Sequence, residues 1–130
     1  MNTPAPAHGL GTGIAKLTVY HLARLIFTGS ALTGEQLEGR PDTEKFESTD
    51  RALIDEVLAR IERAQPKPSD AGCDARWGLI FTNASDERVR TLYLDQFGTS
   101  GVLDGAKVTL SDESLIEWLR ERYGPDSVLA

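Results

Sequence analysis

Few side chains of this 130-residue chain are of the kinds that perform nucleophilic or metal-dependent chemistry. There is one cysteine, Cys73, and there are two histidines, His8 and His21. A zinc site needs three or four His, Cys or carboxylate ligands, which these residues do not supply. Asp74 adjoins Cys73, and a neighbouring carboxylate raises the pKa of a thiol rather than lowering it. The sequence therefore predicts an inert thiol, a half-buried strand histidine at position 21, no metal and no cofactor.

Two glycine-containing segments look like nucleotide-binding or nucleophile motifs but lack the required context. The run Gly9-Leu-Gly-Thr-Gly13 precedes a predicted strand, whereas a phosphate-binding loop must follow a strand and open a helix. Gly29-Ser30 has no glycine two residues later and no helix behind it, so it is not a nucleophile elbow. We therefore expect no catalytic residues and a protein that is not an enzyme.

The first 13 residues, rich in Pro, Ala and Gly, are predicted to be a flexible leader. They lack a basic segment followed by an apolar one, so they do not form a signal peptide as written. The expected location is cytoplasmic, or periplasmic if Met1 replaces a signal peptide. No apolar stretch approaches the roughly 20 residues that a membrane span requires.

The charge balance bears on the partner. The chain has 14 basic and 20 acidic residues, for a net charge of −6, which disfavours nucleic acid and favours a neutral or basic protein. From Asp95 to the end, seven acidic residues outnumber three basic ones. This segment could form an acidic docking face or simply a solvated helix surface.

The most unusual segment is Asp95–Gly105, in which three glycines and one aromatic residue follow a strand. Either Phe97 caps the core while the glycines turn the chain, or the loop is an exposed recognition tip. The residues predicted to contact a partner are Asp95, Gln96, Phe97, Thr99, Ser100, Asp104, Glu117 and Glu121.

Two amphipathic helices are predicted. The first follows the N-cap candidates Ser48 and Thr49 and stops before Pro66, which cannot continue the hydrogen-bond ladder. The second follows Ser111 and ends at Gly124-Pro125. Their apolar residues recur at intervals of three and four, at Leu53, Ile54, Val57, Leu58 and Ile61 in the first and Leu115, Ile116, Leu119 and Tyr123 in the second.

Alternating apolar and polar residues predict the strands. One strand covers Ala15–Leu22, and a hairpin joins Arg76–Thr82 to Arg88–Asp95. A second hairpin turns at Asp104-Gly105, a dipeptide that accepts the positive φ angles of a type I′ turn.

The remaining segments are predicted connections. Thr28–Glu47 is a long connection with a short turn of helix at Gly34–Glu38, and Pro66–Asp74 is a loop. The expected fold class is α+β: an antiparallel sheet of four to five strands with two amphipathic helices packed on one face, in the order β-α-β-β-β-α. Residues 14–130 are expected to form this single domain after the leader 1–13.

The plan of Trp77–Tyr123 resembles that of small bacterial accessory proteins, including immunity proteins. It has a strand hairpin, then Leu94-Asp-Gln-Phe-Gly98, then Asp104-Gly105 and a closing helix. The resemblance implies a toxin–antitoxin-like role, in which an immunity or inhibitor protein neutralises a bacterial effector by occluding its site. There is no lipid-attachment cysteine near the start, so the resemblance does not extend to an anchor.

The expected function is that of a non-catalytic protein-binding protein, an immunity protein or inhibitor. The alternative is a small enzyme or small-ligand-binding domain with a pocket between sheet and helices, lined by Tyr20, Trp77 and Tyr93 with His21 nearby. A third possibility is a structural or assembly module that pairs through an exposed sheet edge, which an unprotected edge on the strand at 15–22 would support.

Overall fold

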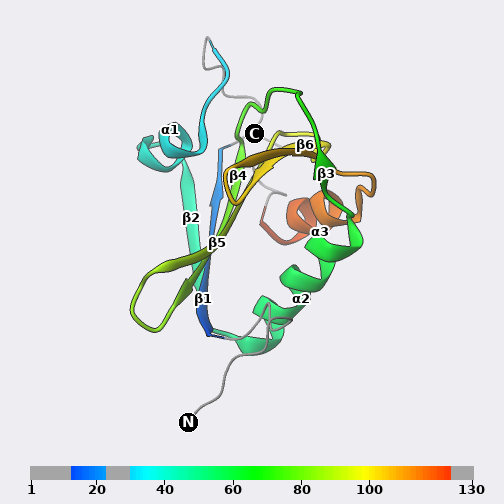
Figure 1. Cartoon of the computed structure of the whole chain (residues 1–130). Helices are drawn as coiled ribbons and strands as arrows, with labels where there is room; N and C mark the ends of the chain where they lie inside the picture. The colour runs from blue at the N-terminus through cyan, green and yellow to red at the C-terminus, as the bar shows by residue number, and fades with distance from the viewer. Residues whose placement is uncertain (1–12, 23–29, 124–130) are drawn as a thin grey trace.

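The computed structural model describes residues 13–22 and 30–123, in which one sheet packs against helices on both faces (Figure 1). All of the expected leader except Gly13 lies outside the described residues. The elements in chain order are β1 (Ile14–His21), α1 (Gly34–Gly39), β2 (Glu44–Ser48), α2 (Arg51–Arg63), β3 (Lys67–Pro68), β4 (Trp77–Asn83), β5 (Arg88–Leu94), β6 (Ser100–Leu103), β7 (Ala106–Thr109) and α3 (Ser114–Tyr123).

The strands form one seven-stranded antiparallel sheet in the order β2-β1-β4-β5-β6-β7-β3. At its centre, Leu17 of β1 lies opposite Phe81 of β4, and Val19 lies opposite Leu79. Residues directly opposite one another in an antiparallel pair point to the same face. These apolar pairs therefore define one face of the sheet, here called the inner face.

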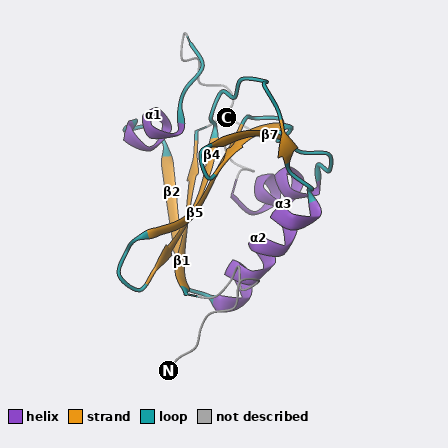
Figure 2. Ribbon diagram, in the orientation of Figure 1, coloured by secondary structure: helices purple, strands orange, loops and turns teal. Residues whose placement is uncertain are grey.

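Helices α2 and α3 cover the inner face (Figure 2). The aliphatic helix residues predicted from the apolar periodicity are buried there, including Ile54 and Val57 of α2 and Leu119 of α3, whereas Tyr123 is partly buried. Burying a large aliphatic side chain contributes about 1.5–3 kcal/mol. The main hydrophobic core therefore lies between this face and the two helices.

Helix α1 packs on the opposite face, here called the outer face (Figure 1). It contributes one buried residue, Leu37, to a small cluster with Leu22, Leu32 and Ala75. The helix is short but well capped, because the Thr33 side chain accepts from Gln36 N–H and the Gln36 side chain accepts from Thr33 N–H.

The predicted fold class is wrong in the number of strands, the number of helices and their order. Two strands were predicted as parts of connections: β2, which has Phe46 as its only apolar residue, and β3, which is two residues long and contains Pro68. The short turn of helix expected at Gly34–Glu38 is a helix that covers the outer face, so the helices do not all pack on one side. Both predicted hairpins are confirmed.

The strand at 15–22 does not have the unprotected edge that would support the assembly-module possibility. Strand β1 is paired on both sides, with β2 and with β4. Strands β2 and β3 are the edges of the sheet instead.

Helix α2 begins one residue later than a cap at Thr49 predicts and two residues later than a cap at Ser48 predicts. Its N-cap is Asp50, whose carboxylate accepts from Ala52 N–H at 3.0 Å, while Ser48 Oγ accepts from Asp50 N–H at 3.1 Å. A carboxylate at this position satisfies an otherwise unpaired N–H and interacts favourably with the helix dipole.

We predict that Asp50→Ala lowers the free energy of unfolding by about 1 kcal/mol, since the N-cap hydrogen bond is lost. Thr49→Ala is the matched control, because it removes the neighbouring exposed side chain without removing the cap. Urea denaturation of both variants measures the difference, and equal losses would show that Asp50 is not the effective cap.

Candidate functional site

The loop between β5 and β6 is built around the side chain of Asp95. Its carboxylate Oδ1 accepts from Gly98 N–H at 2.7 Å and from Thr99 N–H at 3.1 Å. Its main-chain N–H donates to Ser100 O at 3.0 Å, which closes the loop. Asp95 was predicted to contact a partner, but in the structure this oxygen holds the loop together.

The loop is fixed against helix α3 at two points. Gly98 has a φ of +74°, and a Cβ built there would lie 2.3 Å from Cβ of Ile116, so only glycine fits. Arg120 Nη2 donates to Gln96 O at 2.6 Å. Residues 95–99, here called the Phe97 tip, are therefore held by their own backbone and by α3.

Phe97 projects from this fixed loop with 61% of its surface exposed. Among the described residues, the other large hydrophobic residue that is exposed is Val89, at 45%. The interpretation that Phe97 caps the core is wrong, and the alternative of an exposed tip agrees with its position. Glu117 and Glu121 are also exposed, on the helix against which the tip packs.

The structure does not bring all the predicted contact residues together. Asp104 lies at the other end of β6, where its carboxylate accepts from Thr91 N–H at 2.9 Å and pairs with Arg90 at 3.2 Å. It also has the positive φ that the hairpin turn requires. Thr99 and Ser100 are half-buried, and their carbonyl oxygens accept hydrogen bonds within the fold. The exposed residues of the predicted set near the tip are thus Phe97, Glu117 and Glu121.

His21 and Cys73 are both placed where reactivity is suppressed. His21 is buried and stacked on Trp77 with ring centroids 3.9 Å apart, and its burial lowers its pKa despite Glu44 Oε1 at 3.4 Å from Nδ1. Burial, followed by the charges of Asp95 and Asp74, raises the pKa of Cys73 to about 12. The predicted direction for the thiol is confirmed, and a protonated thiol is a poor nucleophile.

The suggestion that Tyr20, Trp77 and Tyr93 line one pocket is wrong. Trp77 belongs to the inner core, whereas Tyr20 and Tyr93 pack on the cluster of the outer face. A sheet lies between them, so these three rings do not line one pocket.

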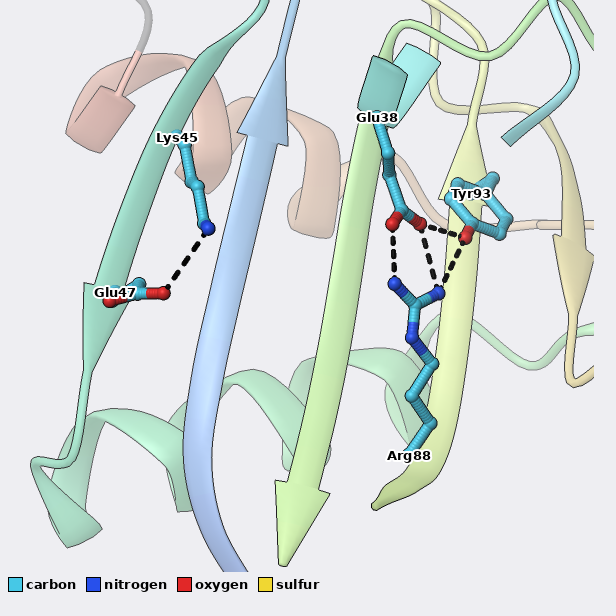
Figure 3. Close-up of polar contacts among 5 residues, drawn as sticks. All are labelled: Glu38, Lys45, Glu47, Arg88 and Tyr93. Atoms are coloured by element: carbon cyan, nitrogen blue, oxygen red, sulfur yellow. Dashed lines mark hydrogen bonds and ion pairs between the residues drawn. The ribbon is translucent and has the colours of Figure 1, made fainter. Parts of the chain in front are cut away.

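A cluster on the outer face was not predicted from the sequence. Arg88 and Tyr93 of β5 both donate to the carboxylate of Glu38 in α1 (Figure 3). Arg88 Nη1 lies 3.0 Å from Glu38 Oε2 and 3.3 Å from Tyr93 Oη. These three residues are here called the Glu38 cluster. Arg88 is 50 positions and Tyr93 is 55 positions from Glu38 in the chain.

The electrostatics of this cluster favour a charged carboxylate and a neutral phenol. Burial alone would raise the pKa of Glu38, but the hydrogen bonds from Arg88 and Tyr93 and the charge of Arg88 outweigh it and lower the pKa. Burial and the hydrogen bond to Glu38 raise the pKa of Tyr93 to about 12. Both Glu38 oxygens are occupied, so the cluster anchors α1 rather than offering a free base.

Tyr93 also holds α1 by shape. A Cβ built on Gly34, the first residue of α1, would lie 2.3 Å from the Tyr93 ring, and one on Gly78 of β4 would lie 3.2 Å from it. The ring is therefore packed closely against two glycine backbones, and its hydroxyl reaches Glu38.

Pockets lie on two sides of α2 within the described part of the chain. One, of about 270 Å³, lies between α2 and the sheet, and the other, of about 390 Å³, lies between α2 and α3. The first is lined by Leu58, Ile61, Glu62, Pro66, Arg90 and Leu103, and the second by Asp50, Ala52, Leu53, Glu56, Arg60, Trp118 and Arg122. In the second, the guanidinium groups of Arg60 and Arg122 lie 5.2 and 5.6 Å from the Trp118 ring. The histidine and cysteine of the described residues line neither pocket.

The described residues contain neither a metal-binding cluster nor a membrane-spanning helix. Among residues 13–22 and 30–123, no three His, Cys, Asp or Glu side chains lie close enough to hold a metal ion. In the same part of the chain, no helix has the length and apolar character needed to cross a membrane.

We predict that Gly34→Ala destabilises the protein by about 1–3 kcal/mol, because its methyl group would overlap the Tyr93 ring and displace α1. Gly39→Ala is the matched control, since it lies in the same helix and its methyl group would meet nothing within 4 Å. Thermal unfolding followed by circular dichroism distinguishes them. A loss at Gly39 as large as that at Gly34 would contradict the packing described.

The raised pKa of Tyr93 predicts a tyrosine that ionises at about pH 12 in the folded protein. Because this value is above that of an unfolded tyrosine, the associated stability is complete below the unfolded pKa and is lost as pH rises through about 12. A spectrophotometric titration at 295 nm should show this component, and Tyr93→Phe should remove it. Tyr20→Phe is the control, which should leave the component in place.

No family model, curated protein or solved structure matches the chain. Three of the predicted contact residues are exposed and lie on adjoining elements. Phe97 is on the tip, and Glu117 and Glu121 are on α3, against which the tip packs.

Proposed function

We propose that the chain is a non-catalytic binding protein that engages another protein through the Phe97 tip. The observation that carries the proposal is an exposed aromatic side chain on a backbone that is already fixed. Asp95 closes the loop, Gly98 seats it on Ile116, and Arg120 binds the carbonyl of Gln96.

The physical reason is the cost of ordering. Binding loses free energy whenever a loop must be immobilised, so a preorganised loop retains more of its contact energy. Aromatic side chains in apolar pockets of a partner are frequent hot spots because they bury a large area with few rotatable bonds. Phe97 is an aromatic side chain on a preorganised loop, so both arguments apply to it.

The surrounding charge favours a neutral or basic partner. Glu117 and Glu121 lie on α3, which supports the tip, and the chain as a whole carries a net charge of −6. Acidic groups at the rim of a contact increase the rate of association with a basic surface more than they increase affinity. The role of an immunity protein or inhibitor stays a prediction, and it requires that the partner be an effector whose active site the tip occludes.

The second candidate is a small-ligand-binding domain, favoured by the apolar pocket of about 270 Å³ between α2 and the sheet. Its lining includes one cation, Arg90, which is already paired with Asp104. The volume is just below the roughly 300–1,000 Å³ that ligand pockets usually occupy. The Phe97 tip therefore supports protein binding better than this pocket supports ligand binding.

We predict that Phe97→Ala abolishes capture of the partner while leaving the fold intact, since the side chain is exposed. Tagged protein is used to capture a partner from lysate of the source organism, and the affinity of the purified partner is then measured by calorimetry. A hot spot at Phe97 corresponds to a loss of about 2 kcal/mol or more.

Val89→Ala is the matched control, because it shortens the other large hydrophobic residue that is exposed on the described surface. It should bind as the unaltered protein does. Equal affinities of Phe97→Ala and the unaltered protein would overturn the proposal. A thermal shift with small apolar acids, lost in Leu58→Trp, would then favour the pocket.

A further inference from the structure

The two edges of the sheet differ in how they are protected. Strand β3 is two residues long, and Pro68 has no N–H to offer a further strand. Strand β2 is five residues long and contains no proline. Within the described part of the chain, β2 pairs only with β1, so its outer edge is the one that can accept another strand.

The side chains of β2 leave this edge accessible. Lys45 lies opposite Tyr20 of β1, and Phe46 lies opposite Val19, so Lys45 and Glu47 point to the outer face and Phe46 to the inner face. Lys45 Nζ is 3.5 Å from Glu47 Oε2 and 5.9 Å from the Tyr20 ring. The lysine therefore extends over the sheet, as Figure 3 shows, rather than along its edge.

The sequence of β2, Glu-Lys-Phe-Glu-Ser, is complementary to itself in one register. A two-fold axis perpendicular to the sheet must pass midway between a residue of the strand and the same residue of the second copy, because opposite residues share a face. With the axis at Phe46, Lys45 lies opposite Glu47 of the second copy, and the reverse pair repeats it. Glu44 then lies opposite Ser48 of the second copy, whose hydroxyl can donate to the carboxylate.

The neighbouring registers are excluded by charge. An axis at Lys45 would place two lysines opposite each other, and an axis at Glu47 would do the same with two glutamates. Like charges directly opposite are destabilising. The charges of β2 therefore select the register centred on Phe46, where two aromatic rings meet on the inner face beside Tyr123, whose ring is 4.9 Å from that of Phe46.

We propose that the chain forms a two-fold homodimer by antiparallel pairing of β2 with β2 of a second copy, which joins the two seven-stranded sheets into one. This surface is separate from the Phe97 tip, so the proposal does not depend on the proposed function. Because two Lys–Glu pairs flank the axis, the association weakens as salt is raised.

The test is sedimentation equilibrium of the full chain over a range of concentrations at low salt. The unaltered protein should form dimers, and Lys45→Glu or Glu47→Lys should each weaken dimerisation roughly tenfold or more, since each creates like-charge pairs across the axis. The double variant Lys45→Glu with Glu47→Lys restores opposite charges at both pairs and should restore dimerisation. Both side chains are about half exposed, so the variants should fold, which circular dichroism checks.

Lys67→Glu at the other edge is the control and should leave the association unchanged. A monomer at every concentration would overturn the proposal. So would a dimer that the single variants do not weaken, because the contact would then lie elsewhere. A folded double variant as monomeric as the single ones would also overturn it, because the charge register would not be the determinant.

Discussion

Every residue of β4 from Trp77 to Thr82 is buried, so the centre of this sheet needs a cover on both faces. On the inner face, Leu79 and Phe81 require the apolar surfaces of α2 and α3. On the outer face, Gly78 and Ile80 require a cover as well, although the sequence there offers little apolar material. Helix α1 and the Tyr93 ring supply part of it. The position of the remaining elements follows from this burial of β4 on two sides.

Acidic side chains that look alike in the sequence have two different roles in the structure. Asp95 and Asp104 accept hydrogen bonds from backbone N–H groups and shape turns, and Glu38 anchors α1 through Arg88 and Tyr93. These carboxylates stabilise the fold because they satisfy donors that would otherwise be unpaired. Acids of α3 such as Glu117 stay exposed, so their charge contributes to the negative electrostatic potential of the surface.

The hairpins and the two longer helices could be predicted from the sequence because their signals are local. Alternation marks β4 and β5, Asp104-Gly105 marks a turn, and apolar periodicity marks α2. Strand β2 could not be recognised from the sequence, because Phe46 is its only apolar residue. A single apolar residue gives no alternating pattern. The two-residue strand β3 has too little sequence to carry any periodic signal.

The candidate sites were less accessible to sequence reasoning. The Glu38 cluster joins residues about fifty positions apart, and a register shift after Phe81 turns Arg88 to the outer face although simple alternation places it with Leu92 on the inner one. Phe97 was within the segment singled out from the sequence, but its exposure depends on how Gly98 packs on Ile116. That contact is set by the tertiary fold and leaves no local pattern.

The tip is shaped by Asp95, Gly98 and Arg120, and Phe97 itself is mostly in solvent. The residues that stabilise this loop therefore differ from Phe97, to which the proposed function assigns recognition. Position 97 can change its side chain during evolution, or in a designed library, at little expense to folding, while the loop that presents it keeps its shape. Under the proposed function, a change of binding partner needs a change at this one position, and the scaffold stays the same.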